Sequence, residues 1–136
     1  MSAAGTHRFA LRVYYEDTDA AGIVYYANYL KFIERGRSEW VRSLGMDQVA
    51  LRRDEGIVFA VRRVEADYLR PAHFDDALVV ETVLDHLGGA RIVLRQAVLR
   101  DGERRFEAVV TLVAMSLDGR AVRLSEGLRA TFSGGR

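Results

Sequence analysis

The sequence predicts an α+β protein in which an antiparallel sheet curves around one long central helix. Apolar residues recur at three- and four-residue spacing between Tyr29 and Leu44, as they do on the buried face of a helix. In the second half of the chain, apolar runs are separated by Gly-Gly and Asp-Gly pairs, which are typical of antiparallel hairpins. Helix and strands are therefore segregated along the chain, which favours α+β packing over alternating β-α-β winding.

The N-terminal part begins with a strand that is expected over Arg8–Tyr15. Apolar side chains occupy every second position there, as in a strand with one buried face: Phe9, Leu11 and Val13. A tight polar segment, residues 16–22, follows this strand and precedes the long helix. Because the helix has only the sheet to pack against, its apolar side is expected to lie on one face of the strands.

The long helix has recognisable ends. Asn28 is the expected N-cap, and Gly45 follows the last apolar residue as a natural C′ residue. Gly36 lies inside the helix, where glycine costs about 1 kcal/mol relative to alanine. This cost indicates that another backbone approaches the helix closely at Gly36. A shorter helix is expected next, over Asp47–Glu55.

Four further strands are expected in the second half of the chain: Val58–Leu69, Leu78–Leu87, Arg91–Arg100 and Phe106–Leu117. Turns with positive φ are expected at three dipeptides: Gly88-Gly89, Asp101-Gly102 and Asp118-Gly119. The strand 106–117 is apolar on both sides, which indicates a central strand with both faces covered. Leu128–Phe132 is expected to add a last short strand. Such a sheet leaves a broad second face or an edge, which a second copy of the chain would cover about a two-fold axis.

Composition excludes several classes of protein. The 136 residues fit one domain, 1–136, and 49% of them are hydrophobic, which indicates a folded chain. A net charge of +1 provides no basic field for nucleic acid, and the absence of cysteine excludes disulfides, iron–sulfur clusters and thiol nucleophiles. The three histidines lack metal-ligand spacing, so no metal or other cofactor is expected. No apolar run reaches ~20 residues and Met1–Arg8 lacks an apolar signal core, so the expected location is the cytoplasm.

Almost all basic residues of the chain are arginines. Of the 20 basic residues, only Lys31 is a lysine. Guanidinium groups bind phosphates in a bidentate fork, so this bias fits recognition of a phosphorylated ligand. A codon bias across the whole genome explains the same observation without any ligand, and the scattered positions of the arginines favour that explanation.

Acidic and small residues crowd the segment 13–29, which leads into the long helix. Free backbone N–H groups and the positive end of the helix dipole lie at this point, and such a terminus stabilises an oxyanion. A nearby carboxylate then acts as nucleophile or general base, and the candidates are Asp17 and Asp19. The same two residues, with Thr18, are also typical of an ordinary turn before a helix. Spacing alone does not show whether the segment is catalytic or an ordinary turn. It also does not show which of the two carboxylates would be the catalytic one.

Aromatic residues gather in the same part of the chain: Tyr14, Tyr15, Tyr25, Tyr26, Tyr29 and Trp40. They either line a pocket for an acyl or aromatic group or pack in the core, and core packing is the expectation for most of them. The depth of such a pocket is not encoded in a linear pattern, so short, long and aromatic acyl groups all stay open.

Two blocks of the sequence match a family pattern. The first block comprises Tyr14–Asp19, Ala20–Gly22 and Ile23–Tyr25, and continues at Tyr29, Phe32, Glu34 and Arg35. The second block comprises Tyr68–Ala72, followed by Asp75, Asp76 and Leu78. Together they resemble the 4-hydroxybenzoyl-CoA thioesterase family of hotdog-fold enzymes, in its Tol–Pal-associated acyl-CoA thioesterase subgroup. The resemblance extends from about Arg12 to Leu117.

This resemblance implies a hotdog fold and the hydrolysis of an acyl-CoA thioester to a free acid and CoA. The catalytic carboxylate of the family falls on Asp19, and the backbone N–H that polarises the thioester carbonyl falls on Tyr26. Asp17 becomes a supporting turn residue. Asp19 then either attacks the carbonyl carbon to form an anhydride or activates a water molecule that attacks it. The resemblance also implies a homodimer at least, and a homotetramer of two dimers is common among relatives.

Two positions depart from the family pattern. Some members of the subgroup have histidine where Tyr26 stands, and tyrosine occurs there in the aromatic-thioester branch, so the acyl preference is open. Some relatives place basic residues for the CoA phosphates at the turn that is formed here by Gly88-Gly89-Ala90. Arg91 is the basic residue left beside this turn, and it is the expected substrate-binding residue. Acyl carrier protein stays open as an alternative carrier of the acyl group.

Two other functions are compatible with this fold. A hotdog dehydratase acting on acyl carrier protein substrates uses a histidine with a carboxylate, and no histidine lies at the start of the long helix. A non-catalytic hotdog protein that binds acyl chains or joins an envelope assembly is the main alternative, although the intact segment around Asp19 argues against lost catalysis. A hydrolysis assay separates these functions, because the fold alone hosts several of them.

Overall fold

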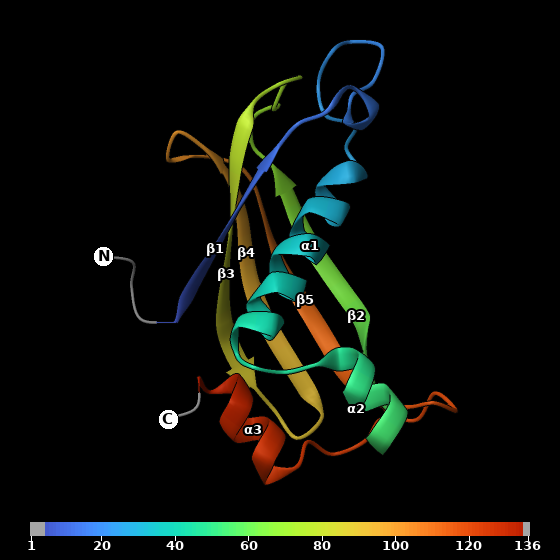
Figure 1. Cartoon of the computed structure of the whole chain (residues 1–136). Coiled ribbons are helices and arrows are strands. Elements are labelled where there is room, and N and C mark those ends of the chain that lie inside the picture. Colours follow the sequence, from blue (N-terminus) through green and yellow to red (C-terminus); the bar gives the residue numbers. More distant parts are fainter. Residues whose placement is uncertain (1–4, 135–136) are drawn as a thin grey trace.

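A computed structural model describes residues 5–134. Five strands form one antiparallel sheet in the order β1-β3-β4-β5-β2, and a long helix crosses one face of it (Figure 1). The strands are β1 (Thr6–Arg12), β2 (Ile57–Tyr68), β3 (Ala77–Leu87), β4 (Arg91–Arg100) and β5 (Glu103–Ser116). The helices are α1 (Asn28–Ser43), α2 (Gln48–Glu55) and α3 (Glu126–Phe132), with one 3₁₀ turn, η1 (Tyr15–Asp17). The predicted α+β class, with an antiparallel sheet around one long helix, is confirmed.

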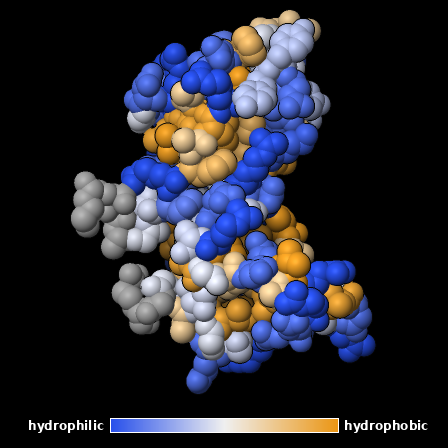
Figure 2. Space-filling model, viewed as in Figure 1, coloured by the Kyte–Doolittle hydropathy of each residue, from blue (hydrophilic) through white to orange (hydrophobic). Residues whose placement is uncertain are grey.

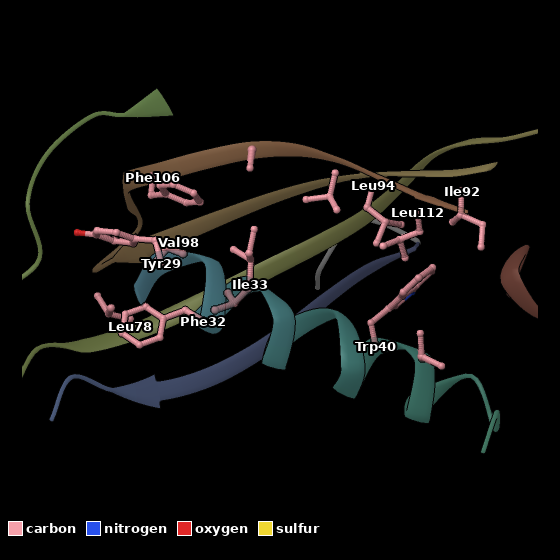
Figure 3. Close-up of a cluster of buried hydrophobic side chains, with 14 of the residues drawn as sticks. Tyr29, Phe32, Ile33, Trp40, Leu78, Ile92, Leu94, Val98, Phe106 and Leu112 are labelled. Atoms are coloured by element: carbon pink, nitrogen blue, oxygen red, sulfur yellow. The ribbon is translucent and has the colours of Figure 1, made fainter. Parts of the chain in front are cut away.

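The core lies between α1 and the sheet. Apolar side chains from α1 point at the strands, as Figure 3 shows for Tyr29, Phe32, Ile33 and Trp40. They meet side chains from β3, β4 and β5: Leu78, Val80, Ile92, Leu94, Val98, Phe106 and Leu112. Phe32 and Phe106 are fully buried, and complete burial of such a side chain contributes about 1.5–3 kcal/mol. The three- and four-residue spacing of the sequence therefore corresponds to the buried face of α1. No helix within residues 5–134 is long and apolar enough to cross a membrane.

The start of α1 differs from the prediction. Ala27, not Asn28, occupies the N-cap position, and it has helical dihedral angles and no capping side chain. The Asn28 side chain instead donates from Nδ2 to the Asp17 carbonyl oxygen at 2.9 Å. This happens because the chain already turns at residues 25–28, where the Asn28 N–H donates to the Tyr25 carbonyl oxygen. At the other end, Gly45 has φ of 85° and ends the helix as expected.

Gly36 does sit at a close approach, but the neighbour is a side chain and not a backbone. A Cβ at Gly36 would lie 2.4 Å from Cγ1 of Val80 on β3. Because Gly36 has no side chain, α1 can pack directly against β3 at this point. Beside it, Gln96 donates from Nε2 to the Ile33 carbonyl oxygen at 2.8 Å and to Oγ1 of Thr82 at 2.9 Å. Gln96 and Thr82 are thereby satisfied although both are buried.

The three predicted turns behave differently. Asp101 and Gly102 both have positive φ, 50° and 79°, and form the expected tight hairpin between β4 and β5. Gly119 has φ of 89°, but its turn leads only to a single bridge between Met115 and Ala121. Gly88-Gly89 does form the predicted turn between β3 and β4, but the predicted positive φ was wrong, because neither of these residues has one. Their turn is closed by backbone bonds from Gly88 N–H to Arg91 O and from Leu124 N–H to Gly89 O.

The strand predicted over Leu128–Phe132 was also wrong, since this segment belongs to α3. Ser125 is its N-cap and accepts the Leu128 N–H at 3.1 Å, and this cap favours a helix. Phe132 is buried, with its ring 5.7 Å from Trp40 and 5.4 Å from Phe59. The shorter helix predicted over Asp47–Glu55 is confirmed as α2, with Asp47 as its N-cap.

One face and two edges of the sheet carry no further element of residues 5–134. β5 is an interior strand as predicted, yet Val109 and Thr111 on its second face are only half-buried, because α1 packs on the other face. β2 forms an edge, and large apolar side chains remain exposed on it and on α1: Leu30, Val61, Val64 and Tyr68. Figure 2 views the side that carries α1 and shows apolar patches between hydrophilic side chains.

Candidate active site

The segment that precedes α1 folds into a small hairpin. The Tyr25 N–H donates to the Asp17 carbonyl oxygen, and the Asp19 N–H donates to the Ile23 carbonyl oxygen, each at 2.9 Å. A bridge between Thr18 and Val24 lies between these two bonds. Residues 17–25 therefore form a compact unit that carries both candidate carboxylates and leads directly into the helix.

This hairpin rests on the second block of sequence that resembled the family. The Val24 N–H donates to the Ala72 carbonyl oxygen at 2.8 Å, and Ile23 pairs with His73. The Tyr29 hydroxyl accepts the Ala72 N–H at 3.0 Å. The tertiary structure thus brings together two segments that are more than forty residues apart in the chain.

Asp17 stabilises the turn itself through hydrogen bonds to its backbone. Its side chain is buried, and Oδ2 accepts the Tyr14 N–H at 2.8 Å. Its carbonyl oxygen accepts both the Tyr25 N–H and the Asn28 side-chain amide. A carboxylate that is buried and committed to backbone groups in this way is poorly placed to reach a substrate, so Asp17 is the structural member of the pair.

Asp19 lies at the exposed side of the hairpin. Its Oδ1 accepts the Ala21 N–H at 2.8 Å, and its carbonyl oxygen accepts the Gly22 N–H at 3.0 Å. Gly22 has φ of 79°, which closes the tight turn. Asp19 therefore does form the local turn that the alternative interpretation expected. Its Oδ2, however, has no hydrogen-bond partner among residues 5–134 and is free to act as a nucleophile or base.

Tyr26 lies at the junction between the hairpin and α1. Within the part of the chain that the structure describes, no acceptor is hydrogen-bonded to the Tyr26 N–H. The helix behind it begins without a capping side chain and without an acidic residue in its first turn, so the positive end of its dipole is not neutralised there. An N–H group in this position can donate to a carbonyl oxygen that develops negative charge.

A hollow of about 280 Å³ opens beside Tyr26. It is lined by Ile23, Val24, Tyr26, Tyr29, Tyr68, Leu69, Arg70 and Pro71. Its aromatic wall is rigid, because the rings of Tyr29 and Phe106 are stacked 4.9 Å apart and the ring of Tyr68 packs 5.0 Å from Phe106. Burial raises the pKa of the Tyr29 and Tyr68 phenols, which are protonated at neutral pH even at their ordinary pKa of about 10. This hollow suits an apolar group attached to a carbonyl at the Tyr26 N–H. A larger hollow of about 530 Å³ lies on the uncovered face of the sheet, away from the hairpin.

The aromatic residues singled out in the sequence divide into two groups. Only Tyr29 and Trp40 are buried in the core, so the expectation that most of the six pack there was wrong. The other four are exposed on or near the hairpin: Tyr14, Tyr15, Tyr25 and Tyr26. Tyr68 was not among the predicted site residues, although it lines the hollow with Tyr26 and Tyr29. Its position at the end of a strand, directly before Leu69-Arg70-Pro71, was the signal that could have found it.

Arg91 lies at the opposite end of the sheet from Asp19. The start of β3 is tied to the hairpin end, since the Asp75 N–H donates to the Val13 carbonyl oxygen. The 11 residues of β3 then span on the order of 30 Å before the turn that leads to Arg91. Arg91 and Asp19 of one chain therefore do not belong to one site.

Two more guanidinium groups lie near the Arg91 turn. Arg129 donates from Nη1 to the Gly88 carbonyl oxygen at 2.6 Å. Nη1 of Arg123 lies 3.4 Å from the point where a Cβ of Gly89 would stand, and Arg123 is exposed. These arginines come from the C-terminal segment, so the sequence pattern around the turn did not reveal them.

Comparison with known proteins identifies the family. The family model described as the thioesterase superfamily matches residues 21–107, which is more than half of the chain. The chain belongs to the thioesterase superfamily. The matched region of this thioesterase contains Tyr26, α1 and Tyr68, and it begins two residues after Asp19.

Relatives and solved structures agree with this assignment. The acyl-CoA thioesterase YbgC of Haemophilus influenzae is 40% identical over 109 residues, which are 80% of each chain. The acyl-CoA thioester hydrolase YbgC of Escherichia coli O6:H1 is 41% identical over 92 residues, 68% of each chain. A probable thioesterase from Bartonella henselae has a TM-score of 0.85 and 38% identity, over 88% of this chain and 99% of that one. A 4-hydroxybenzoyl CoA thioesterase, solved with 4-hydroxybenzoyl CoA, has a TM-score of 0.88 and 23% identity over 94% and 99% of the two chains, which shows a shared fold. The predicted hotdog fold and thioesterase family are confirmed.

Proposed function

We propose that this thioesterase hydrolyses an acyl-CoA thioester to a free acid and CoA. The observation that carries the proposal lies at the junction of the hairpin 17–25 and α1. Among residues 5–134, neither Oδ2 of Asp19 nor the N–H of Tyr26 has a hydrogen-bond partner, and α1 begins there without a capping side chain. The names of the YbgC relatives, acyl-CoA thioesterase and acyl-CoA thioester hydrolase, support the same class of substrate. The subgroup associated with Tol–Pal is part of the proposal and rests on the resemblance of the sequence.

The proposed reaction uses these groups in a simple order. The thioester carbonyl oxygen accepts the Tyr26 N–H, which stabilises the charge that develops on that oxygen. Oδ2 of Asp19 attacks the carbonyl carbon, the carbon–sulfur bond breaks, and CoA leaves as a thiolate while a mixed anhydride forms. Water then hydrolyses the anhydride to the free acid and restores Asp19. In the alternative, Asp19 takes a proton from the water that attacks the carbonyl carbon directly. A thiolate is a good leaving group, so neither route needs a strong general acid.

The phosphates of CoA need a second copy of the chain. Arg91 lies on the order of 30 Å along the sheet from the hairpin, so we infer that an arginine at this turn serves the active site of a neighbouring subunit. Arg123 is the candidate for a second phosphate contact. The exposed edge strand β2 and the uncovered face of the sheet supply surfaces for a homodimer and for a homotetramer. Light scattering after size-exclusion chromatography tests this proposal, and a monomer would overturn it.

The proposal also covers the carrier of the acyl group and the location of the protein in the cell. The charged turn around Arg91 fits CoA, while acyl carrier protein stays an alternative carrier of the acyl group. A cytoplasmic location is proposed on the sequence alone.

A thiol-release assay over a panel of acyl-CoAs tests the function. The panel includes aliphatic chains of several lengths and a hydroxybenzoyl thioester, with wild type and Asp19→Asn side by side. Loss of the carboxylate should lower kcat by about 10²–10⁴-fold, the usual contribution of a positioned acid–base group. Asp47→Asn is the matched control, because Asp47 also accepts backbone N–H groups through Oδ1 and is exposed, but it caps α2. This control should retain wild-type activity.

Each result of the assay has a clear meaning. Turnover by Asp19→Asn that stays near wild type would show that Asp19 is not the catalytic carboxylate. Wild-type protein without turnover on any acyl-CoA would overturn the proposed substrate and favour either acyl carrier protein substrates or a non-catalytic partner protein.

A further inference from the structure

The backbone at Tyr26 is held on both sides of its free N–H. On one side, the Tyr25 N–H donates to the Asp17 carbonyl oxygen, and the Tyr25 carbonyl oxygen accepts the Asn28 N–H at 2.8 Å. On the other side, the Tyr26 carbonyl oxygen accepts the Tyr68 hydroxyl at 3.0 Å. The N–H of Tyr26 is thus the one polar backbone group of this residue that stays open among the residues described.

The Tyr68 hydroxyl gives the Tyr26 carbonyl oxygen a hydrogen-bond partner that the helix does not supply. Tyr26 precedes Ala27, the N-cap residue of α1, so its carbonyl oxygen lies outside the regular helical bonds. Here the Leu30 N–H donates to the Ala27 carbonyl oxygen at 3.2 Å, so the first turn of α1 is tight and leaves the Tyr26 carbonyl without a helical partner. The orientation of the Tyr26 backbone therefore depends on a side chain from the sheet.

Tyr68 is well placed to hold this backbone. It is the last residue of β2 and pairs with Phe106 of β5. Its ring packs edge-on against the rings of Tyr29, at 5.6 Å, and Phe106, at 5.0 Å, and both of those rings are buried. A phenol whose pKa lies at or above its ordinary value of about 10 is protonated at neutral pH, so the hydroxyl has a proton to donate. A ring that packs against two buried rings, at the end of the edge strand β2, thus carries a donor that reaches the start of the helix.

We propose that Tyr68 is a positioning residue for the thioesterase reaction, whose hydroxyl holds the Tyr26 peptide so that the Tyr26 N–H meets the carbonyl oxygen as it becomes negative. This inference rests on the proposed function. Tyr68 acts through Tyr26, and its hydroxyl takes no part in the bonds that form or break. Its contribution is the orientation of a donor, which matters most in the transition state, where the charge on the oxygen is largest.

The expected loss of kcat in Tyr68→Phe follows from the positioning role of Tyr68. Removal of a whole oxyanion donor lowers kcat by about 10²–10³-fold. Tyr68→Phe leaves the Tyr26 N–H in place and only loosens it, so kcat should fall by about tenfold, with KM within about twofold of wild type. The ring and its packing against Tyr29 and Phe106 are retained in this variant, so the fold is preserved.

The experiment compares Tyr68→Phe with Tyr15→Phe on the best acyl-CoA of the panel. Tyr15 is 81% exposed and has no hydrogen bond from its hydroxyl to another described residue, so its variant controls for loss of a phenol near the hairpin. The inhibition constant of a CoA thioether, which has a methylene group in place of the carbonyl, is measured as well. This inhibitor fills the acyl pocket but offers no oxygen to Tyr26, so it reports the shape of the pocket alone.

We expect Tyr68→Phe to lose kcat while its inhibition constant for the thioether stays within about twofold of wild type, and Tyr15→Phe to match wild type in both. Wild-type kcat in Tyr68→Phe would overturn the inference and leave the proposed function standing. An inhibition constant that weakens in parallel with kcat would also overturn it, because Tyr68 would then only shape the pocket. Absence of wild-type turnover, or turnover that does not depend on Asp19, would overturn the proposed function and this inference with it.

Discussion

Replacement of Gly36 by alanine sets two physical effects against each other. Alanine is the better helix former by about 1 kcal/mol, so helix propensity alone predicts a more stable protein. The added Cβ, however, would lie 2.4 Å from Cγ1 and 3.0 Å from Cβ of Val80. Because Val80 is fully buried on β3, it has little room to move away.

The distances decide which effect is larger. Two carbon atoms in contact are normally about 3.5–4.0 Å apart, so α1 and β3 must separate by about 1 Å or Val80 must leave its rotamer. Overpacking of this kind costs about 1–3 kcal/mol. A contact as close as 2.4 Å falls in the upper part of that range, about 2–3 kcal/mol, so after subtraction of the gain in propensity we expect Gly36→Ala to destabilise the protein by about 1–2 kcal/mol. For a chain of this length, that corresponds to a fall in Tm of about 3–8 °C.

Thermal and urea unfolding at one protein concentration measure this change. Arg35→Ala and Arg35→Gly, at the neighbouring exposed position of α1, give the propensity difference without any packing. In the background of Val80→Ala, the cost of Gly36→Ala should shrink by at least about 1 kcal/mol, since the clashing methyl groups are gone. If Gly36→Ala were as stable as wild type or more so, the close approach of α1 to Val80 would not constrain this position.

Two further predictions concern charge. Arg91→Gln should raise KM for an acyl-CoA by about two- to fivefold, the size of one exposed charged contact, but leave KM unchanged for the matching acyl-pantetheine thioester, which lacks the nucleotide phosphates. Arg52→Gln on α2 is the control, and an equal rise of KM on both thioesters would contradict a phosphate contact. Burial lowers the pKa of His7 on β1, partly opposed by the charge of Glu39, and its Nδ1 has no hydrogen-bond partner among the described residues. The unfolded chain therefore binds the proton more readily, so stability is full above pH 6.5 and is lost as the pH falls through the lowered pKa of His7. Tm should fall between pH 7.5 and pH 5.5 by less in His7→Gln than in wild type, and equal falls would exclude His7 as the cause.

Local patterns in the sequence predicted most of the fold. The apolar spacing of α1 and the alternation in β1 depend only on helix and strand periodicity, which each segment carries by itself. The Asp101-Gly102 hairpin was predictable for the same reason, since a turn with two positive φ values has few compatible residues. The errors came where a second local signal competed. Ser125 caps α3 in a segment whose apolar residues also fit a strand. The Gly88-Gly89 turn is closed by the bonds from Gly88 N–H to Arg91 O and from Leu124 N–H to Gly89 O, without the positive φ that a Gly-Gly pair allows.

The candidate site was predictable only in part. The block from Tyr14 to Tyr29 marked the right segment, and the family resemblance placed roles on Asp19 and Tyr26. The pattern did not separate Asp17 from Asp19, because both are common turn residues. Burial separates them, since Asp17 is enclosed by the Tyr14 and Tyr25 backbone, whereas one carboxylate oxygen of Asp19 has no partner among residues 5–134.

The sequence by itself determined the class of fold, the helix that supports the site and the segment that carries its carboxylates, because periodicity, capping and turn chemistry act over a few neighbouring residues. Only the tertiary structure decided which carboxylate is accessible, that Val80 is the neighbour of Gly36, that Tyr68 reaches Tyr26, and that Arg91 lies far from Asp19. These facts depend on how distant segments pack. The distance between two residues in the folded chain is set by the sheet register and the helix that lies on it, and not by their separation in the sequence.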